Sequence, residues 1–134
     1  MHVQFSPPLP RRNKRPTLRP KTKEPSIEEI LIDVCRCFNV PVEMVKSASQ
    51  YYIHVIPRRI YCYVAHVLTN ESCSKISGLI NRDHSTYVDR VDQCLGWFKI
   101  KEPGFMEDWD SYTRKSQIWR EYYQLKLISV KTAV

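Results

Sequence analysis

The chain has 134 residues, of which 43% are hydrophobic, and a formal net charge of +7. This length allows one small domain with flanking segments, and no apolar run is long enough for a membrane-spanning helix. The cysteines are odd in number, contain no Cys-x-x-Cys pair, and stand at positions 35, 37, 62, 73 and 94. We therefore expect reduced, mostly buried thiols, in preference to a disulfide framework, a metal site or a redox site.

The positive charge is concentrated near the N-terminus. Residues 1–24 carry seven basic side chains and one acidic side chain, whereas residues 25–134 are almost neutral. The same segment is rich in proline and has no apolar periodicity, so residues 1–25 are predicted to be a disordered tail. It is either a solubilising leader or a basic arm that lies along phosphates or enters a minor groove. The arm would use Arg11, Arg12, Lys14, Arg15 and Arg19.

The first helix is predicted to begin after Ser26, because Glu29 stands three residues later as in a capping box. It is expected to end at Asn39, and its buried stripe comprises Ile27, Ile30, Leu31, Val34 and Phe38. Pro41 is expected to open a short second helix over 41–45. Residues 47–56 are compatible with a loop or a short strand and are assigned as loop. Pro57 is then predicted to start a third helix that runs to about Leu68.

Residues 73–80 and 88–98 each have the one-sided apolar pattern of a packed helix. The second stripe consists of Val88, Val91, Leu95 and Phe98, and the residues between the two helices at 81 and 82 predict a tight turn. This is the layout of a helix-turn-helix, in which the second helix presents its N-terminal residues to base edges. The sequence at that point is Arg82-Asp83-His84-Ser85-Thr86.

Beyond Phe98 we expect a loop broken by Pro103-Gly104 and then a final helical stretch. Its aromatic stripe is more typical of packing onto its own domain than of a dimer or partner interface. Stacking on single-stranded bases is a third alternative. The stripe consists of Phe105, Trp109, Tyr112, Ser116, Trp119 and Tyr123.

These patterns predict an all-α protein with three parts. Residues 1–25 form the basic tail, residues 26–99 form the helix-turn-helix domain, and residues 100–134 form an aromatic-rich helical extension. A partner or a second copy would bind through Trp109, Tyr112, Trp119 and Tyr123.

Over residues 26–98 the chain resembles the C-terminal DNA-binding domain of the bacterial replication initiator DnaA. The matching residues are Pro57-Arg58, Leu68-Thr69-Asn70, Ser72, Ile76 and above all Arg82-Asp83-His84-Ser85-Thr86. The family signature at the last position reads Arg-Asp-His-[Ser/Thr]-Thr, at the head of the recognition helix. The resemblance implies an all-helical domain that binds duplex DNA, without a cofactor, in replication control or transcription regulation.

The resemblance also implies which residues contact DNA. Asp83, His84, Ser85 and Thr86 would contact bases, since carboxylates, imidazoles and hydroxyls all pair with major-groove edges. The alternative for Asp83 and His84 is a purely capping role. Backbone contacts are expected from Arg58, Arg59, Lys75 and Arg82, and such contacts set register rather than sequence preference.

Three departures from the family support a second hypothesis, a protein-interaction module that keeps the fold but binds nucleic acid weakly. The family's basic loop is replaced by residues 47–52, which carry no positive charge, and Gln50 falls near the place of a minor-groove arginine. Asp89 and Asp92 stand where family members are often basic. The aromatic extension is a further candidate surface for a partner.

An enzyme is not expected. The 134 residues contain no Gly-x-x-x-x-Gly-Lys-[Ser/Thr] loop and no recognisable nucleophile–base pair. We expect a cytoplasmic, nucleoid-associated protein of a bacterium or phage that holds no metal ion.

Overall fold

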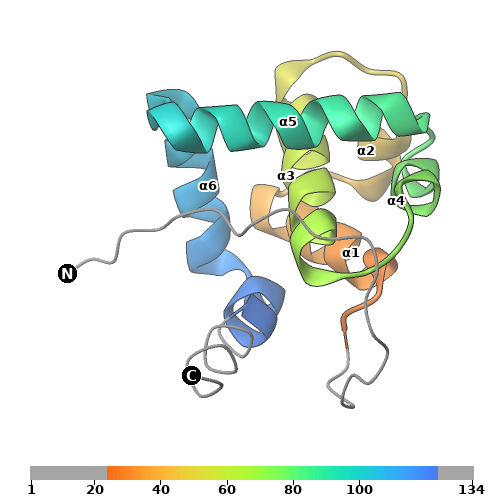
Figure 1. Ribbon diagram of the computed structural model, residues 1–134, viewed down its shortest axis with the longest axis horizontal. Helices are drawn as coiled ribbons and strands as arrows, with labels where there is room; N and C mark the ends of the chain where they lie inside the picture. Colours follow the sequence, from red (N-terminus) through yellow and green to blue (C-terminus); the bar gives the residue numbers. More distant parts are fainter. Residues whose placement is uncertain (1–23, 124–134) are drawn as a thin grey trace.

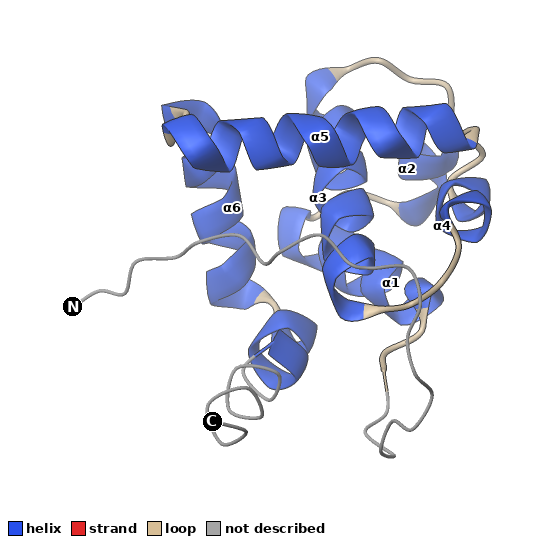
Figure 2. Ribbon diagram, in the orientation of Figure 1, coloured by secondary structure: helices blue, strands red, loops and turns tan. Residues whose placement is uncertain are grey.

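The computed structural model describes residues 24–123 and is all-helical, as the sequence predicts. None of these described residues forms a β-strand (Figure 2). The elements are α1 (Ile27–Phe38), α2 (Val42–Lys46), α3 (Tyr52–Leu68), α4 (Cys73–Leu79), α5 (His84–Ile100), α6 (Pro103–Lys115) and a short π-helix, η1 (Trp119–Tyr123). The predicted tail up to residue 23, with its candidate basic arm, lies outside the described residues, as do residues 124–134.

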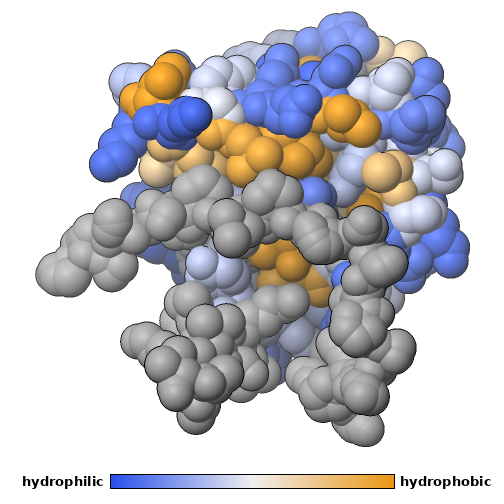
Figure 3. Space-filling view, in the orientation of Figure 1, coloured by the Kyte–Doolittle hydropathy of each residue, from blue (hydrophilic) through white to orange (hydrophobic). Residues whose placement is uncertain are grey.

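Helix α3 runs through the middle of the domain and packs against both α1 and α5 (Figure 1). Helix α4 packs beside the N-terminal end of α5, while α6 turns back from the other end of α5 and reaches α1. The N-terminal end of α5 therefore lies at one edge of the molecule. Hydrophilic side chains predominate along that edge, whereas hydrophobic side chains gather nearer the middle of the same view (Figure 3).

The first helix has the boundaries that its capping residues predict. The backbone N–H of Glu29 donates to the Ser26 hydroxyl and the backbone N–H of Ser26 donates to the Glu29 carboxylate, each over 3.1 Å. Asn39 ends the helix in the left-handed region at φ 56°, a conformation that asparagine tolerates better than most residues. Both signals are local hydrogen-bonding chemistry, which explains why they can be read from sequence.

Helix α3 begins five residues earlier than predicted, at Tyr52 rather than at Pro57. The extra turn is held by Ser49, whose hydroxyl accepts from the Tyr51 backbone N–H and shares a 2.8 Å hydrogen bond with Nδ1 of His54. Val55 in this turn is buried, so tertiary packing favours the helix despite the missing N–H of the proline. Assigning residues 52–56 to a loop was therefore wrong.

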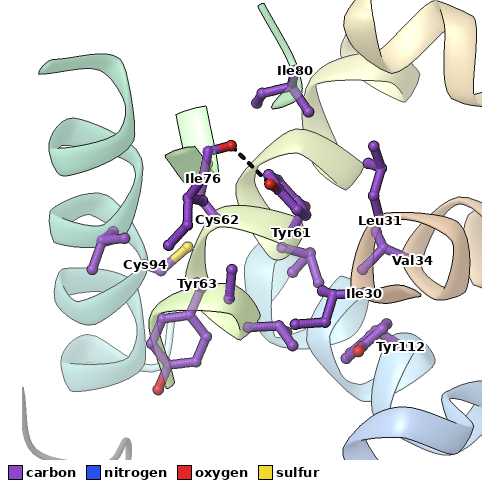
Figure 4. Packing of buried hydrophobic residues seen from close by; sticks show 14 of the residues in the cluster. Ile30, Leu31, Val34, Tyr61, Cys62, Tyr63, Ile76, Ile80, Cys94 and Tyr112 are labelled. Atoms are coloured by element: carbon purple, nitrogen blue, oxygen red, sulfur yellow. Dashed lines mark hydrogen bonds between the residues drawn. The ribbon is translucent and has the colours of Figure 1, made fainter. Parts of the chain in front are cut away.

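The core is formed where α3 meets α1, α4 and α5. Tyr61 is fully buried and donates its hydroxyl to the Ile76 carbonyl of α4 over 2.7 Å (Figure 4). Tyr63 packs against Phe98 at 5.1 Å between ring centroids. The phenol of Tyr61 is therefore paired as well as packed, and it fixes α4, the first helix of the helix-turn-helix, on α3.

The buried stripe of α5 differs from the predicted one. Its buried members are Tyr87, Val91, Cys94 and Phe98, whereas Val88 is 40% exposed and Leu95 is half-buried. Both sets have helical spacing, so the sequence alone did not fix the rotation of the helix about its axis. The structure turns α5 so that a tyrosine and a cysteine face the core.

Pro103 and Gly104 open α6 instead of breaking a loop. Proline suits the first turn because its missing N–H has no helical partner there. Glu102 caps the helix by accepting from the Phe105 N–H over 2.6 Å, and the break from α5 falls at Lys101, whose φ is 54°.

The aromatic stripe packs onto its own chain, as the favoured alternative predicts. Trp109, Tyr112 and Trp119 are each at most 6% exposed, so a partner interface through these three side chains was a wrong prediction. Only Tyr123 of the proposed set is half-buried. The buried carboxylate of Asp33 accepts from the hydroxyls of Tyr112 and Ser116 and thereby joins α1 to the end of α6.

The last two residues of the predicted tail are part of the folded unit. Pro25 is buried, and the carboxylate of Glu24 accepts from both the backbone N–H and the side-chain amide of Asn70, over 3.1 and 2.8 Å. The chain is thus anchored beside the α3–α4 turn at residue 24.

Candidate nucleic-acid interface

Helices α4 and α5 are joined by a tight turn over residues 80–83, close to the prediction. Asn81 adopts the left-handed region at φ 59°, and the Arg82 N–H donates to the Ser77 carbonyl over 2.9 Å. This closes α4 and redirects the chain within a few residues. The result is a helix-turn-helix in which α5 is the second helix.

The Asp83 carboxylate organises the start of α5. One oxygen, Oδ1, accepts from the backbone N–H of Thr86, the Thr86 hydroxyl and the Ser85 hydroxyl, at 3.2, 3.0 and 3.1 Å. These bonds, led by the backbone one, lower the pKa of Asp83 below its usual value, so the carboxylate is charged at neutral pH. Asp83 is therefore the N-cap of the helix, and its other oxygen remains available to an outside donor.

The structure brings the four predicted base-contacting residues together at the exposed end of α5. Asp83, His84 and Ser85 are exposed and Thr86 is half-buried. The next residue, Tyr87, is buried and shares a 3.0 Å hydrogen bond with Nδ1 of His66 on α3. A rigid support thus stands directly behind a cluster that offers a carboxylate, an imidazole and two hydroxyls.

Arg58 does not contact the solvent, so its predicted role as a phosphate contact is wrong. Its side chain is 0% exposed. Its guanidinium donates to four backbone carbonyls at the end of α2 and in the following loop, those of Val45, Ser49, Ser47 and Met44, over 2.7, 2.7, 2.9 and 3.1 Å. Sequence cannot tell a buried arginine from an exposed one, and here the guanidinium serves as a scaffold for the α2–α3 loop.

Arg82 is also engaged with that loop. It is half-buried, and its Nη2 donates to the Ser47 carbonyl over 2.7 Å. The Asn81 side chain adds a bond to the Lys46 carbonyl over 3.2 Å. The α2–α3 loop is consequently fixed to the turn of the helix-turn-helix, and Arg82 positions the turn rather than extending freely into solvent.

The remaining predicted backbone contacts have different surroundings. Lys75 is exposed and pairs with Glu71 at 3.6 Å, one turn earlier. Arg59 is half-buried, with its Cζ 4.8 Å from the centroid of the Trp97 ring on α5. Both side chains remain accessible, and an exposed pair such as that of Lys75 is readily broken for a phosphate.

Two features near the interface went unrecognised in the sequence. Tyr51 and Tyr52 are 60% and 65% exposed and lie next to the loop that Arg82 holds. Arg90 on α5 is half-buried. Asp89 and Asp92, which stand where family members are often basic, are exposed. Arg90 stands between the two aspartates in sequence but projects from another side of the helix. The sequence-based prediction missed this because it gave the wrong buried stripe for α5.

Over residues 24–123, no group of three or more His, Cys, Asp or Glu side chains is placed to hold a metal ion. No described helix is long and apolar enough to span a bilayer. All five cysteines are free and only Cys73 is exposed, and burial raises the pKa of Cys62 and Cys94 to about 12.

Comparison with known proteins agrees with this geometry. Residues 27–93 match the bacterial DnaA protein helix-turn-helix family. The chain is 32% identical over 82 residues to the chromosomal replication initiator protein DnaA of Thermoanaerobacter sp. strain X514, covering 61% of this chain and 18% of the relative. It is 26% identical over 98 residues to the initiator of Deinococcus deserti (71% and 22%) and 30% identical over 101 residues to that of Bacteroides fragilis (75% and 21%).

The chain thus spans about a fifth of the length of these relatives. The matched residues run from the start of α1 into the middle of α5 and include α4, the turn and the N-terminal half of α5. The chain therefore belongs to the bacterial DnaA helix-turn-helix family.

Proposed function

We propose that this protein binds duplex DNA selectively by placing the N-terminal end of α5 in the major groove. The observation that supports this function is the exposed cluster Asp83–Thr86 on a helix end that is rigidly held by the turn and by Tyr87. A helix-turn-helix reads bases with this part of its second helix. The geometry thus supports the four residues that the resemblance to the family implies.

Each side chain has a plausible partner in the groove. The free oxygen of Asp83 accepts from the amino group of cytosine, and His84 donates to or accepts from a purine edge. Ser85 and Thr86 now donate to Asp83, so their oxygens still accept, and the Thr86 methyl suits the methyl group of thymine. Lys75 and Arg59 would contact phosphates, and the basic arm would add non-specific affinity.

We further propose a role in replication control or transcription regulation, in the cytoplasm and on the nucleoid, without catalysis by this chain. The name of the relatives, chromosomal replication initiator, favours replication. The 134 residues hold no P-loop, so DNA binding here proceeds without nucleotide hydrolysis by these residues.

Selection from random duplex DNA tests the function. The full chain is expected to enrich a motif that disappears in the Asp83→Ala/His84→Ala double variant. Asp83 also caps α5, so its replacement by alanine can weaken the helix as well as base reading. Asp83→Asn is the matched control, because asparagine keeps the cap and changes the preferred base from cytosine towards adenine. Retention that depends only on salt, with no enriched motif for the wild type, would contradict base reading.

A second candidate, a protein-interaction module, is favoured by one specific observation. Tyr51, Tyr52 and Ile53 are consecutive in the chain and are all exposed, by at least 40% each. Consecutive exposed apolar residues are typical of an interaction site. Light scattering of the wild type and of a Tyr51→Ser/Tyr52→Ser variant distinguishes the two candidates, since only an interaction module loses self-association through this change.

A further inference from the structure

One side of α5 carries an arginine that the sequence did not single out. Thr86, Arg90 and Trp97 recur at intervals of four and seven residues, so they lie along one side of the helix. Arg59 of α3 lies on the same side, because its guanidinium covers Trp97 and its backbone carbonyl accepts from the Cys94 thiol at 3.8 Å. Arg59 and Arg90 are therefore neighbours along α5, leading away from the base-contacting end.

These two arginines have no acidic partner in direct contact within residues 24–123. The salt bridges of this region involve Arg36, Lys75 and Arg114 instead. Nε of Arg59 is buried and donates to no acceptor in the described structure. Burial and the positive charge of Arg90 both lower the pKa of Arg59, which Asp108 offsets only in part. The pair thus concentrates positive charge that no salt bridge neutralises within residues 24–123.

The acidic residues of α5 lie elsewhere on the helix. At 100° per residue, Asp89 projects about 100° from Arg90 around the helix axis and Asp92 about 160° away. Both are exposed, whereas Arg90 is half-buried and its charge acts on Arg59 of α3. The helix therefore has a basic side and an acidic side, and a polyanion is attracted to only one of them.

We propose that Arg59 and Arg90 form a phosphate-binding strip for the DNA strand that borders the groove entered by α5. The proposal rests on the function above, because that function fixes where the duplex lies. Arg90 is six residues from His84, or about 9 Å along the helix, and the major groove is about 12 Å wide. A backbone that flanks the groove is thus within reach of Arg90, and Arg59 extends the strip farther along α5, at Trp97. Stacking on Trp97 holds the Arg59 guanidinium ready for a phosphate.

The salt dependence of DNA binding by the full chain tests the strip. Each neutralised phosphate contributes about 0.9 to the slope of log K against log salt concentration. Arg90→Gln should reduce that slope by about one unit, and Arg59→Gln/Arg90→Gln by about two, on every duplex sequence. Arg90→Lys should keep the slope, and so should Arg114→Gln, the control at an exposed arginine of α6. An unchanged slope for Arg90→Gln overturns the proposal.

A set of duplexes, each with one neutral methylphosphonate, locates the contact. This test compares only the wild type and Arg90→Gln, so its result does not depend on the folding of the Arg59 variant. The wild type should lose affinity at one flanking phosphate, and Arg90→Gln should be insensitive at that same position. Equal sensitivity of both proteins at every position overturns the strip.

The two proposals fail in different ways. A wild type that enriches no motif, with the slope still reduced by Arg90→Gln, refutes base reading and leaves the strip as a phosphate site. If the wild type selects a motif and Arg90→Gln leaves the salt slope unchanged, the strip is refuted and base reading stands.

Discussion

Replacing Arg58 by alanine should destabilise the protein strongly, because this buried guanidinium holds the α2–α3 loop through four carbonyls. The bond to Val45 is buried, and leaving its carbonyl without a donor costs about 1–3 kcal/mol. The other three bonds are partly buried, so their carbonyls regain water and contribute about 0.5–1 kcal/mol each. The expected loss in the free energy of unfolding is about 2.5–6 kcal/mol.

Urea denaturation followed by circular dichroism at 222 nm measures this loss. For a domain of this size, 3 kcal/mol corresponds to a fall in the melting temperature of at least about 12 °C. Arg58→Lys should give an intermediate result, since one ammonium cannot reach all four carbonyls. Arg114→Ala, at an exposed arginine paired with Asp110, should stay within about 0.5 kcal/mol of the wild type.

The same variant separates the two roles considered for Arg58. A scaffold arginine changes stability, whereas a phosphate contact changes the salt slope of DNA binding and leaves stability intact. If Arg58→Ala unfolds within about 0.5 kcal/mol of the wild type, the side chain is not the buried scaffold that the structure shows.

Two further predictions concern the core. Asp33→Ala should lower the free energy of unfolding by about 2–4 kcal/mol, because the hydroxyls of Tyr112 and Ser116 lose a buried carboxylate acceptor. A loss below about 0.5 kcal/mol in urea denaturation would contradict the stabilising role of these bonds between α1 and the end of α6. Iodoacetamide at pH 8 should modify the native protein rapidly at Cys73 only, since the other thiols are buried and burial raises the pKa of Cys62 and Cys94 to about 12. Rapid modification at a second cysteine, detected by mass spectrometry, would show that the core opens readily.

Features that depend on neighbours in sequence could be predicted. The capping box at Ser26 and Glu29, the left-handed end at Asn39 and the N-cap at Asp83 all depend on hydrogen bonds within a few residues. The turn before α5 belongs to the same class. The all-helical fold class and the place of the Asp83–Thr86 cluster at the start of α5 followed from such local signals together with the apolar periodicity.

Features that depend on tertiary packing could not be predicted. The early start of α3 is favoured by the burial of Val55, whereas the local sequence signal, Pro57, predicts a later start. The burial of Arg58 depends on carbonyls that lie 9 to 14 residues earlier in the chain. Arg90 was overlooked because the sequence allowed two rotations of α5, and only the structure shows which side of the helix faces α3.

The most direct test of base reading is a titration of the His84→Ala variant with a selected duplex and with a scrambled duplex of equal length. His84 is exposed, so its loss leaves the capping bonds of Asp83 and the fold intact. If α5 reads bases, affinity should fall by about 5- to 150-fold on the selected duplex, equivalent to about 1–3 kcal/mol, and remain unchanged on the scrambled one. An equal loss on both duplexes, or no loss on either, would contradict sequence reading through this helix.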